Sequence, residues 1–145
     1  MRTKKPLILC VVVILLAGMI AVGHVLKDDS WVLWGNWGLV FPKDAECTQI
    51  YKKTSEPSFH GDGIRYHVFR CKNADAMQTA FEWREISDES IETVESWLES
   101  IEVPPEQRTD FSNCVYEHWS QQDGSELFLL WNSQNSEIYV IERFL

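Results

Sequence analysis

The residues best placed to do chemistry lie in a glycine-rich stretch just before a predicted strand. His60, Asp62, Arg65 and His67 fall within eight residues, and a glycine stands on each side of Asp62. Glycines on both sides of an aspartate let neighbouring backbone N–H groups point together, which is one way to hold an anion. The first hypothesis is therefore a small-ligand or ion-binding loop that uses these four residues.

Two other interpretations of this stretch stay open. His60 and Asp62 form part of a metal site if His67 or His118 completes it, because imidazole and carboxylate groups bind zinc. Gly-Asp-Gly is also typical of a turn that reverses the chain, with the aspartate bonded to its own backbone. The histidines are scattered, so we predict no metal site and no cofactor.

A row of glutamates is the second candidate site. Glu92, Glu95, Glu99 and Glu102 recur every three or four residues along one side of a predicted helix that contains no Lys or Arg. Like charges at this spacing each destabilise a helix by a few tenths of a kcal/mol. The row is either a docking surface for a basic protein or peptide, or a solvated surface neutralised by cations from elsewhere in the fold.

Cysteine spacing predicts one disulfide. After residue 26 the cysteines are Cys47, Cys71 and Cys114, and none forms the CxxC pair of zinc or redox motifs. Cys47 and Cys71 stand at the outer ends of two predicted strands. In an antiparallel hairpin the residue numbers of paired positions have a constant sum, here 118, so these two cysteines face each other. We predict a Cys47–Cys71 bridge, which an oxidising compartment permits. The alternative is three reduced, half-buried cysteines.

Local signatures of the common catalytic classes are absent from the chain. It contains no GxSxG elbow, HExxH pair, GxxxxGK[ST] loop or GxGxxG turn. Catalytic triads assemble in space, so an undetected hydrolase remains a rival hypothesis. We assign no catalytic residue and predict a protein that is not an enzyme.

A small α+β domain is needed to position these candidate groups. Its clearest helix is Asp88–Glu102, because the apolar residues Ile91, Val94, Leu98 and Ile101 line one face. Ser87 or Asp88 caps its start, and two prolines follow its end. Strands are predicted at 46–53, 64–71, 114–120, 126–131 and 137–144, with a tight turn at Asp123-Gly124.

These elements predict an antiparallel sheet of about five strands with one amphipathic helix on a single face. Residues 73–84 are ambiguous, since their alanines favour a second short helix while residues 81–86 favour a strand. Alternation in the second strand places Tyr66 and Val68 on one face, and His67 and Phe69 on the other.

The N-terminus predicts a membrane anchor. A basic tail at residues 1–6 precedes Leu7–Leu26, a run of 20 residues without Asp, Glu, Lys or Arg. A helix of this length spans about 30 Å, enough to cross a bilayer, and the basic tail orients the N-terminus inward. The alternative is a signal peptide cleaved before His24, which leaves a secreted domain.

A Trp-rich linker at residues 27–42 is predicted to join the anchor to a domain at 43–145. Trp31, Trp34 and Trp37 recur every three residues. They form either an aromatic belt in the lipid headgroup zone or a lead-in whose indoles pack into the domain core. Both interpretations stay open.

The charge of the chain restricts its partners. Of 13 basic residues three lie in the first five positions, which leaves ten against all 22 acidic residues, a net charge of −12. Such a domain repels nucleic acid and anionic lipid surfaces. We expect a single-pass membrane protein of bacterial type, whose domain outside the cytoplasm binds a basic protein or peptide.

Overall fold

The computed structural model describes residues 28–56, 58 and 61–145. The predicted span Leu7–Leu26 and the candidate residue His60 lie outside the described residues. The chain divides into two compact units, Met1–Val40 and Phe41–Leu145. The described part of the first unit contains the short helix α2 (Ser30–Trp37). The second unit is a small α+β domain.

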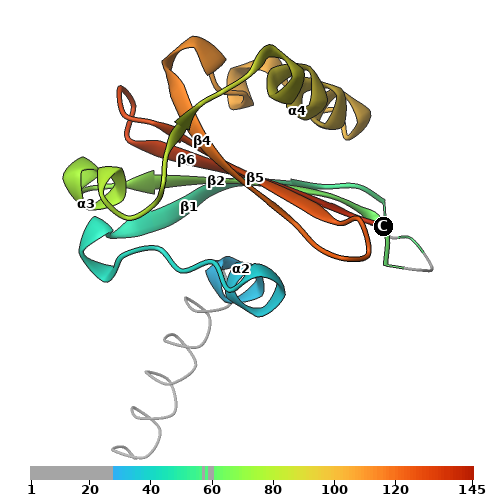
Figure 1. The fold of residues 1–145 in the computed structure, drawn as a ribbon, viewed down its shortest axis with the longest axis horizontal. Helices are drawn as coiled ribbons and strands as arrows, with labels where there is room; N and C mark the ends of the chain where they lie inside the picture. The colour runs from blue at the N-terminus through green and yellow to red at the C-terminus, as the bar shows by residue number, and fades with distance from the viewer. Residues whose placement is uncertain (1–27, 57, 59–60) are drawn as a thin grey trace, which may run out of the picture. The chain divides into compact units, whose positions relative to one another are not determined.

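A six-stranded antiparallel sheet forms the centre of this domain (Figure 1). The strand order is β1-β2-β6-β5-β4-β3, so β6 lies between the β1–β2 hairpin and the β4–β5 hairpin. The strands are β1 (Cys47–Thr54), β2 (Gly63–Cys71), β3 (Arg84–Glu85), β4 (Cys114–Ser120), β5 (Glu126–Asn132) and β6 (Glu137–Phe144).

The sixth strand corrects the predicted count of about five. β3 has two residues, Arg84 and Glu85, which pair with Tyr116 and Val115 at the edge of the sheet. β3 lies within residues 81–86, where a strand was the open alternative, and its two residues are too few to show an alternation. The other five strands lie within one or two residues of their predicted bounds.

Helices and turns complete the domain. They are η1 (Lys43–Ala45), α3 (Ala74–Gln78), α4 (Asp88–Ser100), η2 (Pro105–Gln107) and η3 (Phe111–Asn113). The ambiguous segment contains both of the elements that its sequence favours, the short helix α3 and, within residues 81–86, the strand β3. The Asn73 side chain caps α3 by accepting the Ala76 N–H at 3.3 Å. α4 begins at the predicted residue and ends two residues earlier than predicted.

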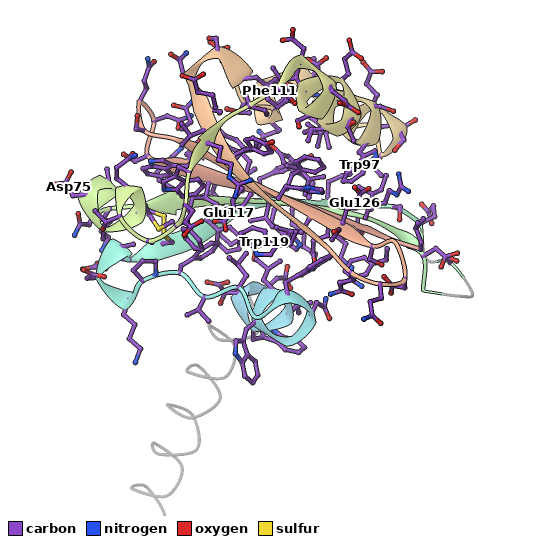
Figure 2. All side chains as sticks on the ribbon, in the orientation of Figure 1. Asp75, Trp97, Phe111, Glu117, Trp119 and Glu126 are labelled. Carbon is purple, nitrogen blue, oxygen red and sulfur yellow. A yellow bond between two sulfur atoms is a disulfide. The ribbon has the colours of Figure 1, made fainter. Side chains whose placement is uncertain are left out.

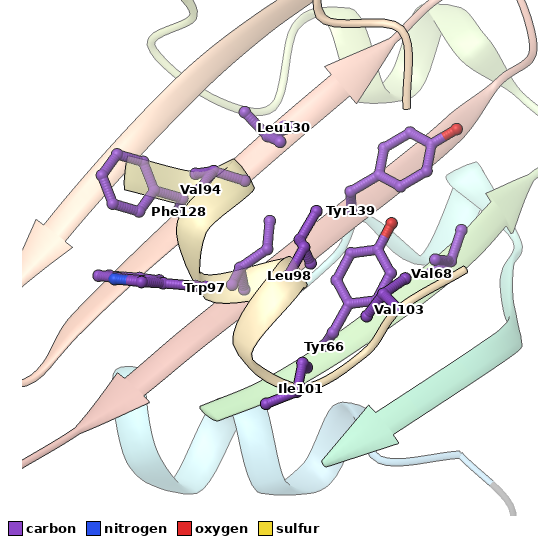
Figure 3. Packing of buried hydrophobic residues seen from close by; sticks show 11 residues of the cluster. Tyr66, Val68, Val94, Trp97, Leu98, Ile101, Val103, Phe128, Leu130 and Tyr139 are labelled. Carbon is purple, nitrogen blue, oxygen red and sulfur yellow. The ribbon is translucent and has the colours of Figure 1, made fainter. Parts of the chain in front are cut away.

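α4 forms because its sequence combines an N-cap with an apolar stripe. Ser87 Oγ accepts the N–H of Ser90 at 3.2 Å and satisfies one of the free donors of the first turn. Val94, Leu98 and Ile101 are buried against one face of the sheet (Figure 3). The core cluster comprises Tyr66, Val68, Val94, Trp97, Leu98, Ile101, Val103, Phe128, Leu130, Tyr139 and Ile141.

The opposite face of the sheet is also buried, contrary to the predicted cover on a single face. Its fully buried side chains include His67, Phe69, Leu127, Leu129, Trp131, Ile138 and Val140. β5 is a continuous apolar run, the pattern of a strand buried on both sides. Within the domain, Trp131 Nε1 donates to Gln78 Oε1 of α3 at 3.1 Å, and Phe41 packs edge-on against Phe69.

The β1–β2 hairpin joins Cys47 to Cys71 in a disulfide, drawn in yellow in Figure 2. The register pairs these two residues directly, as the index sum of 118 requires. Beyond Gln49 the sum changes to 119, because Ile50 forms an irregularity in β1. Cys114 remains a free, buried thiol, and this burial raises its pKa.

Candidate functional site

The loop that connects β1 and β2 uses its own backbone groups to close the hairpin. Ser55 N–H donates to the Ile64 carbonyl at 2.8 Å, and Ile64 N–H donates to Ser55 Oγ at 3.1 Å. Gly61 N–H donates to the Ser58 carbonyl at 3.3 Å. Two of the N–H groups that an anion cradle would need therefore have acceptors within the loop. This arrangement supports the turn interpretation of the Gly-Asp-Gly stretch.

Gly63 has a structural reason to be glycine. Its φ of 154° is rare for residues with a side chain, and a Cβ at this position would collide with Ser55 Oγ. The close approach of Ser55 is what forms the end of the hairpin. The second glycine of the candidate loop thus serves chain reversal.

Of the three candidate residues that the structure describes in this stretch, two lie together and one lies apart. Asp62, which is exposed, and Arg65 both line a depression of about 290 Å³, where the Arg65 guanidinium stacks over the Phe144 ring at 4.5 Å. His67 is only 1% exposed and lies further along β2, inside the sheet. The described residues do not bring Asp62 and His67 to one ligand.

His67 instead belongs to a buried polar network. Its Nε2 lies 3.0 Å from Glu142 Oε2 on β6, and its Nδ1 lies 3.3 Å from Gln49 Nε2 on β1. Glu142 is 0% exposed. Buried polar groups are costly unless they are hydrogen-bonded, and each of these side chains satisfies another. We assign His67 a structural role that ties the central strand β6 to the β1–β2 hairpin.

His118, the other proposed metal ligand, is far from this network. It lies on β4 and faces the α4 side of the sheet, where its ring stacks on Phe128 at 4.4 Å and its Nε2 is 3.3 Å from Glu126 Oε1. His67 faces the opposite side. Among the described residues, no group of three or more His, Cys, Asp or Glu side chains is arranged to hold a metal ion.

The glutamate row on α4 is exposed along its whole length. Glu92, Glu95 and Glu99 lie on the exposed side of α4, whereas Glu102, predicted as part of the same helix, is exposed beyond its end, with a φ of 56°. In the described part of the chain, the ion pair recorded for this row is Glu99 Oε1 with Arg108 Nη1 at 4.0 Å. An exposed pair at this distance is weak. The structure therefore brings one cation to the row, and the acidic character of the row persists.

A polar cleft of about 400 Å³ lies beside the C-terminal end of α4, between the sheet and η2. Its walls include Arg70 from β2, Arg108 after η2, and Glu137 and Tyr139 from β6. Glu137 accepts from Arg70 Nη2 at 2.7 Å and from the Tyr139 hydroxyl at 2.6 Å. Burial raises the pKa of Tyr139 to about 12, so the phenol stays protonated at neutral pH.

Arg108 connects this cleft to the glutamate row. Its Nε donates to the Val103 carbonyl at 2.9 Å, which holds the guanidinium between Glu99 and the cleft wall. Sequence reasoning missed the cleft because its residues come from four segments that are distant in the chain. The spacing of prolines and charged residues at 104–108 gives no local signal for it.

Glu117 on β4 faces the side of the sheet opposite α4, and the Glu82 carboxylate lies near it (Figure 2). Burial raises the pKa of Glu117, and the nearby Glu82 carboxylate raises it further. Glu117 Oε2 is buried without a hydrogen-bond partner among the described residues. The backbone N–H of Glu82 and the charge of Arg84 act in the opposite direction and lower the pKa of Glu117.

Comparison of the chain with models of protein families, with curated proteins and with solved structures found no match. Across residues 28–56, 58 and 61–145, no helix is both long and apolar enough to cross a membrane. The search for a spanning helix does not cover Leu7–Leu26, which the described residues do not include.

Proposed function

We propose that this chain is a single-pass membrane protein whose α+β domain works outside the cytoplasm and binds a basic protein or peptide. It acts by occupancy, as an accessory, inhibitory or sensing module, without turnover. The observation that carries the proposal is the exposed glutamate row on α4. Residues 85–107 contain eight acidic residues and no Lys or Arg.

The disulfide supports the proposed location. Disulfides persist mainly in oxidising compartments outside the cytoplasm. The Cys47–Cys71 bridge thus agrees with the orientation expected from the basic tail and the apolar run Leu7–Leu26. The alternative of a cleaved signal peptide places the same domain in the same compartment, without an anchor.

The cleft beside α4 supports the proposed mode of binding. A flat acidic helix attracts cations without fixing their position, whereas a recess gives a side chain of the partner a place to insert. Glu106 extends the acidic surface to the rim of this cleft, and Glu137 lies in its wall. A partner with one anchoring residue beside a run of Lys or Arg fits both features.

Neutralising the row is expected to weaken binding and to stabilise the fold slightly. In the variant Glu92→Gln/Glu95→Gln/Glu99→Gln, decalysine binding measured by fluorescence anisotropy should weaken at least about threefold, since each exposed pair contributes about 0.2–1 kcal/mol. Added salt should mimic the change by screening the exposed charges. The free energy of unfolding should rise slightly, because like-charge repulsion is removed.

The matched control changes the same number of charges elsewhere. Asp44, Glu56 and Asp75 are exposed and lie outside residues 85–107, so Asp44→Asn/Glu56→Gln/Asp75→Asn should keep most of the affinity. If both triple variants lose affinity equally, decalysine senses only the net charge, and the row is an ordinary solvated surface.

A further inference from the structure

Three of the five large apolar side chains that are exposed among the described residues lie just after the predicted membrane span. Trp31, Trp34 and Val40 are 59%, 64% and 61% exposed. Single exposed apolar residues are common on protein surfaces, but two indoles exposed to this extent in neighbouring positions of one helix require an explanation. All three residues belong to the unit that begins with the predicted anchor.

The helix α2 (Ser30–Trp37) places the two indoles on the same side. Trp31 and Trp34 are three residues apart, so their side chains project from neighbouring positions of the helix surface. The helix ends at Gly38, whose φ of 68° suits glycine and whose N–H donates to the Trp34 carbonyl at 2.8 Å. No charged residue occurs from Ser30 to Pro42.

The short segment between the predicted membrane span and α2 limits how far α2 can lie from the bilayer. Leu26 ends the apolar run, and Ser30 begins α2 four residues later. Four extended residues reach at most about 14 Å. The headgroup zone on each side of a bilayer is about 5–8 Å thick. If Leu7–Leu26 spans the membrane, α2 starts at or next to the headgroup zone of the same bilayer.

We propose that Trp31 and Trp34 insert into the headgroup zone of the membrane in which the chain is anchored. An indole suits this zone because its ring is apolar and its N–H finds acceptors among headgroups and interfacial water. This inference rests on the proposed membrane anchor. Contact is apolar rather than electrostatic, since Asp28 and Asp29 lie before the helix and repel anionic lipid.

Depth-sensitive quenching in vesicles tests the inference. The full chain is reconstituted into phosphatidylcholine vesicles, with or without bromine atoms on the acyl chains near the headgroups, and tryptophan fluorescence is compared. Brominated lipid should quench part of the emission of the natural protein. Trp31→Phe/Trp34→Phe should lose most of this quenching, and the loss should persist at high salt.

The control variant is Trp83→Phe/Trp119→Phe, which removes two half-buried indoles of the domain. It should be quenched to the same absolute extent as the natural protein. Equal quenching of Trp31→Phe/Trp34→Phe and the natural protein would overturn the inference. A dependence of the emission of Trp31 and Trp34 on protein concentration would also overturn the inference, because a second copy of the chain would then cover these indoles.

Flotation of the vesicles tests the membrane anchor separately from the indole contact. Protein that does not float with the vesicles refutes the anchor, and the indole contact falls with it. If the protein floats but Trp31→Phe/Trp34→Phe is quenched as much as the natural protein, only the indole contact is refuted.

Discussion

Replacement of Leu98 by alanine is expected to lower the free energy of unfolding by about 2–5 kcal/mol. Leu98 is 1% exposed and packs in the core cluster near Tyr66 and Val103 (Figure 3). The substitution removes buried methyl groups and leaves a cavity that the sheet cannot close. A loss of this size approaches the whole stability of a small domain. Urea unfolding followed by circular dichroism measures it.

Glu95→Ala is the matched control, because Glu95 lies on the exposed side of the same helix. Alanine favours a helix, and surface substitutions change stability by no more than about 0.5 kcal/mol. Equal losses in the two variants would mean that α4 does not pack through the face that carries Leu98.

Removal of the disulfide is expected to cost about 3–3.5 kcal/mol in the double variant Cys47→Ala/Cys71→Ala. The bridge closes a loop with a sequence separation of 24 residues, and the estimate follows from the entropy that this loop loses in the unfolded chain. Urea unfolding of the oxidised natural protein and of the variant measures the difference. Peptide mapping without reductant should recover Cys47 joined to Cys71.

Cys114→Ala serves as the control for this experiment. Cys114 is buried and hydrogen-bonds with Thr109 at 3.1 Å, so its replacement removes a local contact without opening a covalent loop. We expect a smaller loss than in the double variant. A mapped bridge between Cys114 and either other cysteine, or a double variant as stable as the natural protein, would contradict the assignment.

The elements with strong periodicity are the ones that sequence alone located. α4 has an apolar residue every three or four positions and a serine cap, and its start was predicted to the residue. The stripe is wider than the pattern indicated, since Trp97 is also buried and packs edge-on against Phe128. An apolar helix face commonly covers more than 100° of the surface, which includes neighbours of the strictly periodic residues.

Pairing between distant strands could not be predicted in the same way. β6 inserts between β2 and β5, and nothing in the local pattern of β6 specifies its neighbours. The partner of His67 is Glu142, 75 residues away, which a local search for ligand spacing cannot find. The cleft at Arg70, Arg108 and Glu137 depends on the same long-range arrangement.

The exposure of the acidic row, unlike the pairing of distant strands, could be predicted from the sequence. Its spacing alone places Glu92, Glu95 and Glu99 on one exposed side of α4, and the structure places them there. What the helical period could not give is the cation nearby, since Arg108 follows α4 through a turn at two prolines. A helical period carries information only within its own helix.

The topology of the full chain tests the central claim most directly. A tag is added after Leu145, the protein is expressed in a bacterial host, and protease is applied to intact spheroplasts. Our account predicts that the tag is digested from outside while the protein remains in the membrane fraction after alkaline extraction. A protected tag, or full-length protein in the soluble cytosolic fraction, would contradict a domain anchored outside the cytoplasm.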